Sequence, residues 1–330
     1  MKLFQILPIV ILLAGVACSD SRSKAASRTS PVELQLQVSV PFHFVVYGDS
    51  RFHDPKDTEA SNPLVRQALV QAIAQTSPAF ISFGGDIVYN GYDKDDWKVF
   101  DTETAIWREK RIPVYPALGN HDLHGDEQVA LGNYFERFPD LKSSIYYSVR
   151  AANTLMLVLD SALDETSGPQ GQWLTQKLDH LPGEVDFVLI ILHHPPYTSS
   201  SDDKKFGGGH SARSQEQALA KMLEARQQNL RARIVVFSGH VHNYERHEHG
   251  GVTYFVTGGA GAHAYPIERG KDDPFQSKEV NYHYLQLEDD QGKLKITMNR
   301  LDLTGSKAAW TEPDSVTIAV PTAKAATQGQ

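Results

Sequence analysis

Hydrophobic and polar residues follow two different spacings along the first half of the chain, and these spacings predict strands alternating with helices. Short apolar runs that end at a glycine or a polar residue are typical of buried strands. Between the first two runs, Asn62 is a predicted N-cap, Pro63 stands in the first turn, and apolar residues recur at helical spacing from 64 to 73. The predicted strands cover residues 40–50, 79–86, 112–122, 144–150, 154–160, 185–196, 233–242 and 252–259, and the predicted helices cover 62–75, 95–110, 171–181 and 214–228.

Strands dominate the second half of the pattern. Residues 282–302 predict a closing hairpin that turns at Asp-Asp-Gln-Gly. A long polar insertion rich in glycine and serine precedes residue 214, and loops of this length are usually functional or disordered. No internal repeat and no mid-chain linker is apparent, so we expect one α/β domain from about residue 38 to residue 320, followed by a disordered tail at 321–330.

Composition places the chain among globular proteins and excludes several partners. The chain has 330 residues, of which 41% are hydrophobic, and a formal net charge of −8. An acidic protein has no general electrostatic reason to bind nucleic acid or an anionic membrane surface. We therefore expect no nucleic-acid partner, and any anion that the protein handles must be held by a local cluster of positive charge.

The first residues predict export. Lys2 precedes an apolar stretch that ends in small residues, which is typical of a signal peptide and too short for a spanning helix. Cys18 is the only cysteine, which excludes an internal disulfide, and its placement resembles a bacterial lipoprotein signal. We expect a signal peptide at 1–17, a lipidated Cys18 with a flexible tether at 18–37, and a lipid-anchored protein that faces the periplasm or the cell exterior. An ordinary secretory peptide cut near Ala17 is the alternative.

Polar side chains follow five of the predicted strands at the points where these strands end. They are Asp49, Asp86, the trio Asn120, His121 and Asp122, the pair His193 and His194, and the pair His240 and His242. In open α/β sheets, ligand sites lie beyond the carboxyl ends of the strands, so we expect these side chains to meet at one edge. Each of them alone is adequately explained as a turn or surface residue, but that explanation accounts poorly for all five at once.

The chemistry of this set predicts a metal centre. Carboxylate, amide and imidazole ligands without thiolate suit zinc, manganese or iron. The set is too large for one tetrahedral ion, whereas two ions that share a bridging carboxylate would use it. Two metals about 3.5–4 Å apart can hold both oxygens of an in-line phosphoryl displacement.

Five motifs in this order resemble those of calcineurin-like metallophosphoesterases: GDSR, GGDIVY, GNHD, LHHPP and GHVHNYER. GDIVY and GHVHNYER are most similar to the purple acid phosphatase branch, and the resemblance spans about residues 43–300. It implies a four-layer α/β/β/α sandwich, with two β-sheets flanked by helices in a single catalytic domain. It also implies two divalent or trivalent metal ions (Fe, Zn or Mn), one held by Asp49, Asp86, Tyr89 and His242 and the other by Asp86, Asn120, His193 and His240, with Asp86 bridging them.

Two positions depart from the family pattern or align loosely with it. The wider family has a histidine ligand where this chain has Arg51, and the purple branch replaces that ligand by a tyrosine, which Tyr89 matches. Arg51 either binds phosphate or forms a salt bridge in its loop. His210 stands where plant-like members carry a histidine on the substrate side, and an ordinary loop residue is an equal alternative. The resemblance also places His121 against the substrate oxygens, beside Asn120.

The sequence therefore predicts an exported, dinuclear metal-dependent phosphoesterase that hydrolyses phosphorylated small molecules, as acid phosphatases hydrolyse phosphomonoesters. A metal-bound hydroxide would attack phosphorus in line, and His121 would serve the leaving oxygen, with His210 as a second catalytic candidate. Arg51, Asn120 and His121 are the candidate substrate-binding residues. The alternative within the enzyme class is a phosphodiesterase or nucleotide hydrolase. The alternative outside it is a metal-holding surface lipoprotein that binds phosphorylated ligands. No feature of the sequence predicts the oligomeric state.

Overall fold

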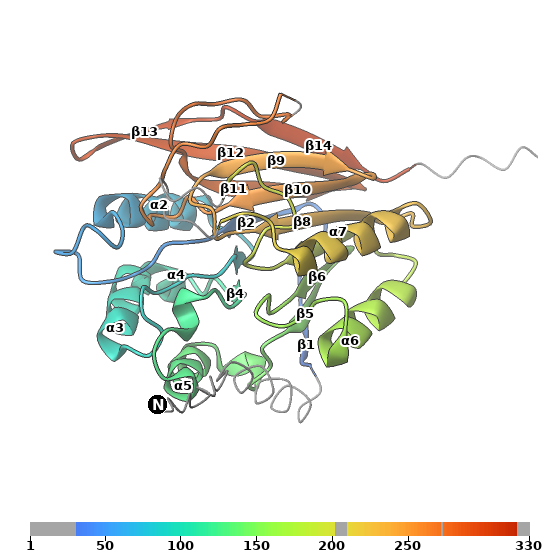
Figure 1. The fold of residues 1–330 in the computed structure, drawn as a ribbon, viewed down its shortest axis with the longest axis horizontal. Coiled ribbons are helices and arrows are strands. Elements are labelled where there is room, and N and C mark those ends of the chain that lie inside the picture. Colours follow the sequence, from blue (N-terminus) through green and yellow to red (C-terminus); the bar gives the residue numbers. More distant parts are fainter. Residues whose placement is uncertain (1–30, 202–209, 272, 322–330) are drawn as a thin grey trace, which may run out of the picture.

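The computed structural model describes residues 31–201, 210–271 and 273–321, which form two β-sheets packed face to face with helices outside them (Figure 1). The expected four-layer α/β/β/α sandwich in a single domain is confirmed. Within these ranges, no helix combines the length and the apolar character that crossing a membrane requires. The predicted signal peptide, Cys18 and nearly all of the predicted tail lie outside the described residues.

The first sheet has the strand order β1-β5-β6-β7-β8-β10-β9. Its strands are β1 Glu33–Leu36, β5 Tyr147–Ala151, β6 Thr154–Val158, β7 Phe187–Ile191, β8 Arg233–Ser238, β10 Val252–Thr257 and β9 Tyr244–His249. β6, β7, β8 and β10 run parallel to one another, whereas β9 is antiparallel to β10. The carboxyl ends of β7 and β8 therefore lie at the same edge.

The second sheet has the order β13-β12-β11-β2-β3-β4, with β14 also paired to β12. Its strands are β2 Phe42–Tyr47, β3 Ile81–Phe83, β4 Val114–Pro116, β11 Tyr282–Asp290, β12 Lys293–Thr304, β13 Lys307–Thr311 and β14 Ser315–Ala319. β2, β3 and β4 are parallel, so their carboxyl ends also share an edge. The predicted hairpin is confirmed as β11 and β12, and its turn uses positive φ values at Gln291 (46°) and Gly292 (77°).

Helices cover the sheets on both sides, with α2 to α5 on one side of the molecule and α6 and α7 on the other (Figure 1). The helices are α2 Pro63–Thr76, α3 Lys94–Glu103, α4 Ala105–Glu109, α5 Glu127–Arg137, α6 Gly168–Asp179 and α7 Ser214–Gln227, with short 3₁₀ turns η1 His121–Leu123 and η2 Pro139–Leu141. Asn62 caps α2 as predicted, because its side chain accepts the backbone N–H groups of Leu64 and Val65. The helix predicted at 95–110 is instead two helices, which meet at Thr104.

The alternation of side chains along the strands produces two hydrophobic cores. Met156 and Ile191 belong to the core between the sheets, whereas Leu157 and Ile190 belong to the core beneath α6 and α7. All four are 0–1% exposed, and burying such a side chain contributes about 1.5–3 kcal/mol. Both faces of the first sheet are therefore covered, which explains why β6 and β7 are continuous apolar runs.

The expected boundary between tether and domain is wrong. Residues 33–36 lie within the expected tether, but they form β1, which pairs in parallel with β5 and places Glu33 opposite Ser148. Leu34 and Leu36 alternate with polar residues and pack against the core between the sheets. This short alternation is typical of a half-buried edge strand, so the domain includes residue 33.

Candidate metal centre

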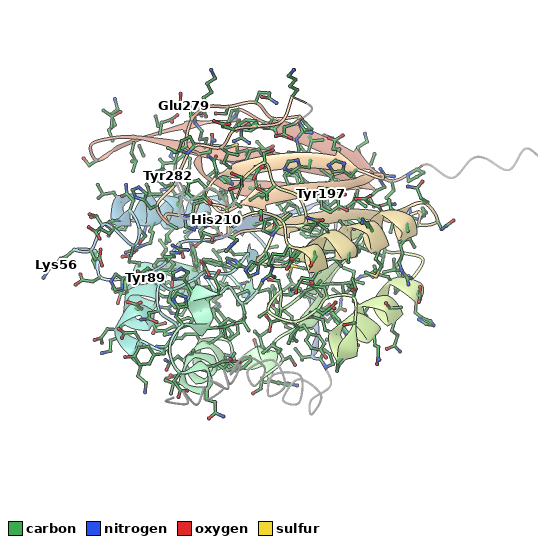
Figure 2. All side chains as sticks on the ribbon, viewed as in Figure 1. Lys56, Tyr89, Tyr197, His210, Glu279 and Tyr282 are labelled. Atoms are coloured by element: carbon green, nitrogen blue, oxygen red, sulfur yellow. The ribbon has the colours of Figure 1, made fainter. Side chains whose placement is uncertain are left out.

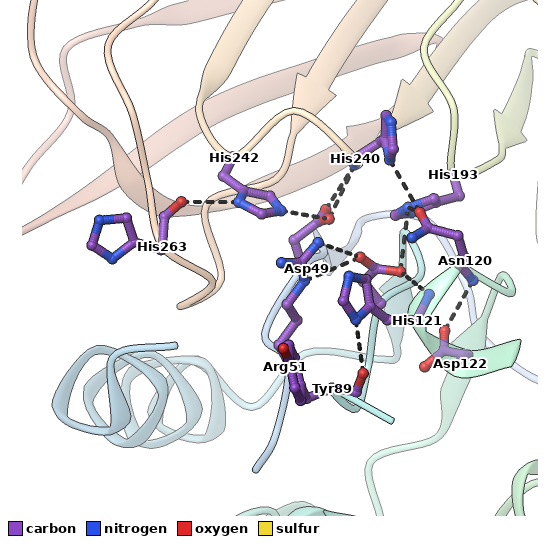
Figure 3. Close-up of polar contacts among 12 residues, drawn as sticks. Asp49, Arg51, Tyr89, Asn120, His121, Asp122, His193, His240, His242 and His263 are labelled. Atoms are coloured by element: carbon purple, nitrogen blue, oxygen red, sulfur yellow. Dashed lines mark hydrogen bonds and ion pairs between the residues drawn. The ribbon is translucent and has the colours of Figure 1, made fainter. Parts of the chain in front are cut away.

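Two groups of loops meet where the strands of the two sheets end (Figure 3). The loops after β2, β3 and β4, which carry Asp49, Asp86 and Asn120, are termed the oxygen loops. The loops after β7 and β8, which carry His193, His240 and His242, are termed the histidine loops. The structure brings these six side chains together, although they come from positions up to 193 residues apart in the chain.

Three of the six residues have a left-handed backbone conformation. The φ angle is 64° at Asp49, 52° at Asp86 and 68° at His240. Residues other than glycine rarely adopt this region, and they keep it where the surrounding structure enforces it, most often at functional sites. The loops also approach closely. A Cβ atom at Gly119 would lie 2.2 Å from the backbone nitrogen of Asp86, and one at Gly239 would lie 2.2 Å from Oδ2 of Asp49. The close packing of the loops therefore requires these two motif glycines.

Asp122 fastens the oxygen loops to one another. Its Oδ1 accepts hydrogen bonds from the backbone N–H groups of Ile87 (2.9 Å) and Val88 (3.2 Å), and its Oδ2 accepts one from Gly119 (2.9 Å). Burial, and then the charge of Asp86, raise the pKa of Asp122 to about 8. The place of Asp122 in the GNHD motif does not by itself reveal this supporting role.

Asp49 and Asp86 are the two carboxylates at the middle of the site, and both are 0% exposed. One oxygen of each and a ring nitrogen of His193 lie within 4.8 Å of one another, a spacing that could hold a metal ion. Both oxygens of Asp49 lie near the backbone N–H of His240, at 3.1 and 3.0 Å. Oδ1 of Asp86 accepts the backbone N–H of His121 at 2.9 Å and lies 3.3 Å from Nε2 of His193.

Backbone carbonyl groups orient two of the buried histidines. Nδ1 of His193 lies 3.0 Å from the carbonyl oxygen of Gly84, and Nδ1 of His242 lies 2.9 Å from that of His263. A carbonyl only accepts, so each Nδ1 carries the proton and each Nε2 is left as an acceptor. Nε2 of His242 lies 3.7 Å from Oδ1 of Asp49 and is buried without a hydrogen-bond partner among the described residues. This is the arrangement of a histidine that binds a metal ion.

The side-chain oxygen of Asn120 lies between two imidazole rings. It is 3.0 Å from Nε2 of His193 and 3.2 Å from Nδ1 of His240. These atoms, with Oδ1 of Asp86, form a donor set that suits zinc, manganese or iron. This set is termed the Asn120 half of the centre. The set of Asp49, His242 and Oδ2 of Asp86 is termed the Asp49 half.

Arg51 lies against the carboxylate that the two halves share. Its Nε and Nη2 lie 3.2 and 3.1 Å from Oδ2 of Asp86, so the salt-bridge alternative for Arg51 is present in the structure. Burial favours the neutral form of Asp86, but His193, Arg51 and His121 together lower its pKa well below its usual value. Burial, and then the charge of Asp86, raise the pKa of Asp49 well above its usual value. One guanidinium compensates one carboxylate, and a bound cation would compensate the other.

Tyr89 and His121 pack together at the end of the second oxygen loop. Nδ1 of His121 lies 2.7 Å from the backbone carbonyl oxygen of Tyr89, and burial lowers the pKa of His121 to about 4. The ring of Tyr89 contacts the rings of His53 and His121 at centroid distances of 5.0 and 5.2 Å. Its hydroxyl group has no hydrogen bond to any residue that the structure describes. Metal ligation by Tyr89 stays a prediction.

The long loop before α7 brings His210 to the histidine loops; Figure 2 locates His210 and Tyr89 in the whole molecule. The ring of His210 lies 5.0 Å from that of His240 and 5.3 Å from that of Tyr265, measured between centroids. The backbone N–H of His242 in turn donates to the hydroxyl oxygen of Tyr265 at 3.4 Å. His210 is therefore placed beside the centre, and its catalytic role stays a prediction.

A largely buried polar cluster lies behind the histidine loops. Oγ of Ser161 lies 2.8 Å from Nδ1 of His194, and the carbonyl oxygen of Ser161 accepts a hydrogen bond from Arg213 at 2.5 Å. Arg213 also pairs with buried Glu216, with 3.0 Å between Nε and Oε2. Burial, and then the charge of Glu216, raise the pKa of Glu165 to about 9. Three distant segments build this cluster, so no local sequence pattern could have revealed it.

A cavity of about 340 Å³ adjoins the Asn120 half. Its lining combines apolar side chains with polar ones, namely Leu118, Leu123 and Ala162 with Ser161, His194 and Arg213. Asn120 itself also lines the cavity, which therefore borders the candidate ligands directly. A space of this size and mixed lining is typical of small-molecule sites.

Comparison with known proteins identifies the family. A family model described as calcineurin-like phosphoesterase matches residues 42–244, which is more than half of the chain. The chain belongs to the calcineurin-like phosphoesterase family. The resemblance expected from the five motifs is thereby confirmed, and the group of Asp49, Asp86 and His193, which could hold a metal ion, lies where the strands of this fold end.

Solved structures of this fold include two phosphatases. A purple acid phosphatase from seeds of yellow lupin (Lupinus luteus) is similar over 86% of this chain, with 17% identity and a TM-score of 0.63. This chain spans 54% of the lupin protein. A dimetal phosphatase from Danio rerio is similar over 85% of this chain and 100% of its own, with 16% identity and a TM-score of 0.55. GAP50 of Plasmodium, described as the anchor in the inner membrane complex, is similar over 88% of this chain and 91% of its own, with 15% identity and a TM-score of 0.58. At these identities the likeness establishes the shared fold.

Proposed function

We propose that this metallophosphoesterase uses two metal ions to hydrolyse small phosphomonoesters. Family membership supports a hydrolase, and the substrate class and the pair of ions are the proposal. The observation that carries it is the buried Nε2 of His242, which lies 3.7 Å from Asp49 and has no hydrogen-bond partner in the described part of the chain. A buried nitrogen with a free lone pair beside carboxylates is most readily explained as a metal ligand.

The donor atoms divide into two ion sites that share Asp86. The Asp49 half would hold one ion, with the hydroxyl group of Tyr89 as the additional ligand implied by the purple acid phosphatase motif. The Asn120 half would hold the other. Ions bound there would lower the pKa of water and neutralise negative charge on the phosphoryl oxygens.

His121 is the candidate proton donor to the leaving oxygen. Its Nδ1–H is held by the carbonyl group of Tyr89, so Nε2 is the atom left to meet a substrate. Burial lowers the pKa of His121 to about 4, so the ring is neutral near pH 7, but the negative charge of a bound phosphate would raise that pKa again. The protonated Nε2 then donates to the leaving oxygen. His210, beside His240, is the second candidate for contact with the substrate.

The remaining groups would bind the substrate. Arg51 uses Nε and Nη2 for Asp86, and its Nη1 makes no hydrogen bond to the residues described, so Nη1 is available to a phosphate oxygen. The cavity beside Asn120 would receive the alcohol part of a small phosphomonoester, whose apolar atoms would contact Leu118 and Leu123.

Paired chromogenic substrates test the proposal. Full-length protein loaded with zinc, manganese or iron is assayed with p-nitrophenyl phosphate and with bis(p-nitrophenyl) phosphate. We expect a higher kcat/KM for the monoester and loss of turnover after chelation. A higher kcat/KM for the diester would instead establish the phosphodiesterase alternative.

A binding protein without turnover is the second candidate. The likeness to GAP50, which is described as an anchor, favours it, because a phosphoesterase fold can evidently serve a different role. Metal-loaded protein that binds inorganic phosphate but hydrolyses neither chromogenic ester would establish this alternative.

We also propose that the chain is exported and anchored by lipid at Cys18, which lies outside the described residues. The apolar stretch before Cys18 and the polar residues after it support this proposal. Cys18→Ser should move the protein from the membrane fraction to the soluble fraction. Wild-type protein that is soluble and carries no acyl chain would instead show an ordinary secretory peptide.

A further inference from the structure

The two oxygens of Asp86 have different partners. Oδ1 accepts the backbone N–H of His121 and lies 3.3 Å from Nε2 of His193, so it faces the Asn120 half. Oδ2 accepts two hydrogen bonds from the guanidinium group of Arg51, at 3.2 and 3.1 Å. An ion in the Asn120 half can therefore use Oδ1 directly, whereas an ion in the Asp49 half must compete with Arg51 for Oδ2.

Arg51 is held firmly in this position. Its backbone N–H donates to the carbonyl oxygen of Asp86 at 3.0 Å. Its own carbonyl oxygen accepts hydrogen bonds from Oγ of Ser61 (2.9 Å) and Nη1 of Arg66 (3.2 Å). Its φ angle is 46°, and its side chain is only 14% exposed. Contacts on both sides of the residue thus present the guanidinium group to the shared carboxylate.

Arg51 also supplies the positive charge of the site. Asp49 and Asp86 are 0% exposed, and neighbouring buried carboxylates are strongly destabilising unless positive charge compensates them. In the described ranges, Arg51 is the one lysine or arginine that forms an ion pair with either carboxylate. The guanidinium group of Arg66, which contacts the carbonyl oxygen of Arg51, is itself paired with Glu103 at 2.9 Å. The charge of Arg51 is permanent, because a guanidinium group does not lose its proton in proteins.

We propose that Arg51 is a built-in cation that makes the two halves of the centre unequal. The Asn120 half binds one ion tightly, and the Asp49 half binds a second ion weakly, because that ion must displace two charge-assisted hydrogen bonds and remain near a fixed positive charge. A neutral histidine at this position would be a ligand and would strengthen ion binding in the Asp49 half. Arginine at the same position weakens it. The inference rests on the proposed metal centre and adds that metal supply controls how much of the protein carries both ions.

Calorimetric titration with Zn²⁺ tests this inference without any measurement of activity. The full-length protein, freed of metal, is compared with Arg51→Ala and with Arg137→Ala. Arg137 is a matched control, because its side chain is also 14% exposed and pairs with an aspartate, Asp101, at 3.0 Å. We expect wild type and Arg137→Ala to show two dissociation constants that differ by roughly tenfold or more. We expect Arg51→Ala to bring the two constants together.

Two further variants test whether the charge of Arg51, and not its packing, causes the difference, and whether the weak site is the Asp49 half. Arg51→Lys keeps the positive charge and should retain the unequal constants, which also covers the case in which Arg51→Ala fails to fold. His242→Ala should abolish the weakly bound Zn²⁺ ion and leave the tightly bound one, because His242 belongs to the Asp49 half.

Each contrary result has a distinct meaning. Equal constants in the wild type, unchanged constants in Arg51→Ala, or loss of the tightly bound ion in His242→Ala would each overturn the role of Arg51 while leaving the phosphoesterase proposal intact. Failure of the wild type to bind Zn²⁺, and also Mn²⁺ and Fe²⁺ in the same titration, would overturn both.

Discussion

The oxygen loops and the histidine loops serve one centre, but they are held in place by different means. In the oxygen loops, Asp49 and Asp86 have positive φ angles, and Asp122 ties the loops together through three backbone N–H groups. In the histidine loops, backbone carbonyls fix the rings of His193 and His242 through Nδ1. His240 shares the positive φ angle of the two aspartates, so the difference lies in the supports: a buried carboxylate ties the oxygen loops together, whereas backbone carbonyls orient the rings of the histidine loops.

The difference shows how the two sheets are joined at the site. His193 follows a strand of the first sheet, but the carbonyl group that orients its ring belongs to Gly84, after β3 of the second sheet. His240 likewise donates its backbone N–H to Asp49 across the same boundary. The oxygen loops therefore form a preset frame against which the histidines are positioned, and the variants below test each part of that arrangement.

Removing Asp86 should have the largest effect, because its carboxylate contacts residues on which both halves of the centre depend. Asp86→Ala should lose bound metal and fall to background turnover, because the carboxylate meets His193 on one side and Arg51 on the other. Metal analysis and p-nitrophenyl phosphate assays measure the two losses. Asp95→Ala, an exposed aspartate in α3, is the control. Wild-type metal content in Asp86→Ala would contradict the shared-ligand arrangement.

Replacing His121 tests whether the oxygen loops also carry a group that acts on the substrate without binding a metal ion. Its backbone N–H contacts Asp86, but its ring is held by Tyr89, so His121→Ala should keep the metal. We expect kcat to fall by roughly 10²–10⁴-fold, the range for a lost general acid. His124→Ala is the matched control, because its ring lies 4.2 Å from that of His121. Loss of one ion in His121→Ala would show instead that this residue is a ligand.

The strand ends that carry the candidate ligands could be predicted from the sequence, because the residues of each strand specify that strand without help from its neighbours. β7 reads FVLII and β8 reads RIVVFS, and such apolar runs are recognisable without knowledge of their neighbours. Asp49 and His193 then come two residues after β2 and β7 end, so local pattern was enough to place them.

Elements that depend on distant partners were missed. β9 Tyr244–His249 reads YERHEH and lacks an apolar alternation, and it is a strand because it pairs with β10. α5 Glu127–Arg137 contains Gly132 within its apolar pattern, which weakens the helical signal. The supporting contacts of Asp122 span up to 35 residues, so its role also required the fold.

Asp122→Asn sharpens the comparison by weakening only the frame of the oxygen loops. An amide group offers one oxygen, so its nitrogen would face a backbone N–H donor that Asp122 now satisfies. We expect the free energy of unfolding to fall by about 1–3 kcal/mol, as for a buried donor left without a partner. Denaturant unfolding measures this change, with exposed Asp140→Asn as the control. An unchanged free energy would mean that the backbone alone maintains the oxygen loops.

Glu165→Gln probes the support behind the histidine loops and should change only the pH dependence of stability. Burial and Glu216 raise the pKa of Glu165 from 4.5 to about 9. Between these values the folded chain keeps a proton that the unfolded chain releases, so rising pH lowers stability by at most about 1.4 kcal/mol per pH unit. Below pH 4.5 both states are protonated and this contribution to the pH dependence vanishes. Glu165→Gln cannot ionise, so its unfolding free energy should decline less from pH 6 to 8 than that of wild type or the exposed control Glu109→Gln. Equal slopes in all three proteins would show that Glu165 is charged in the folded chain, and that Arg213 compensates both glutamates.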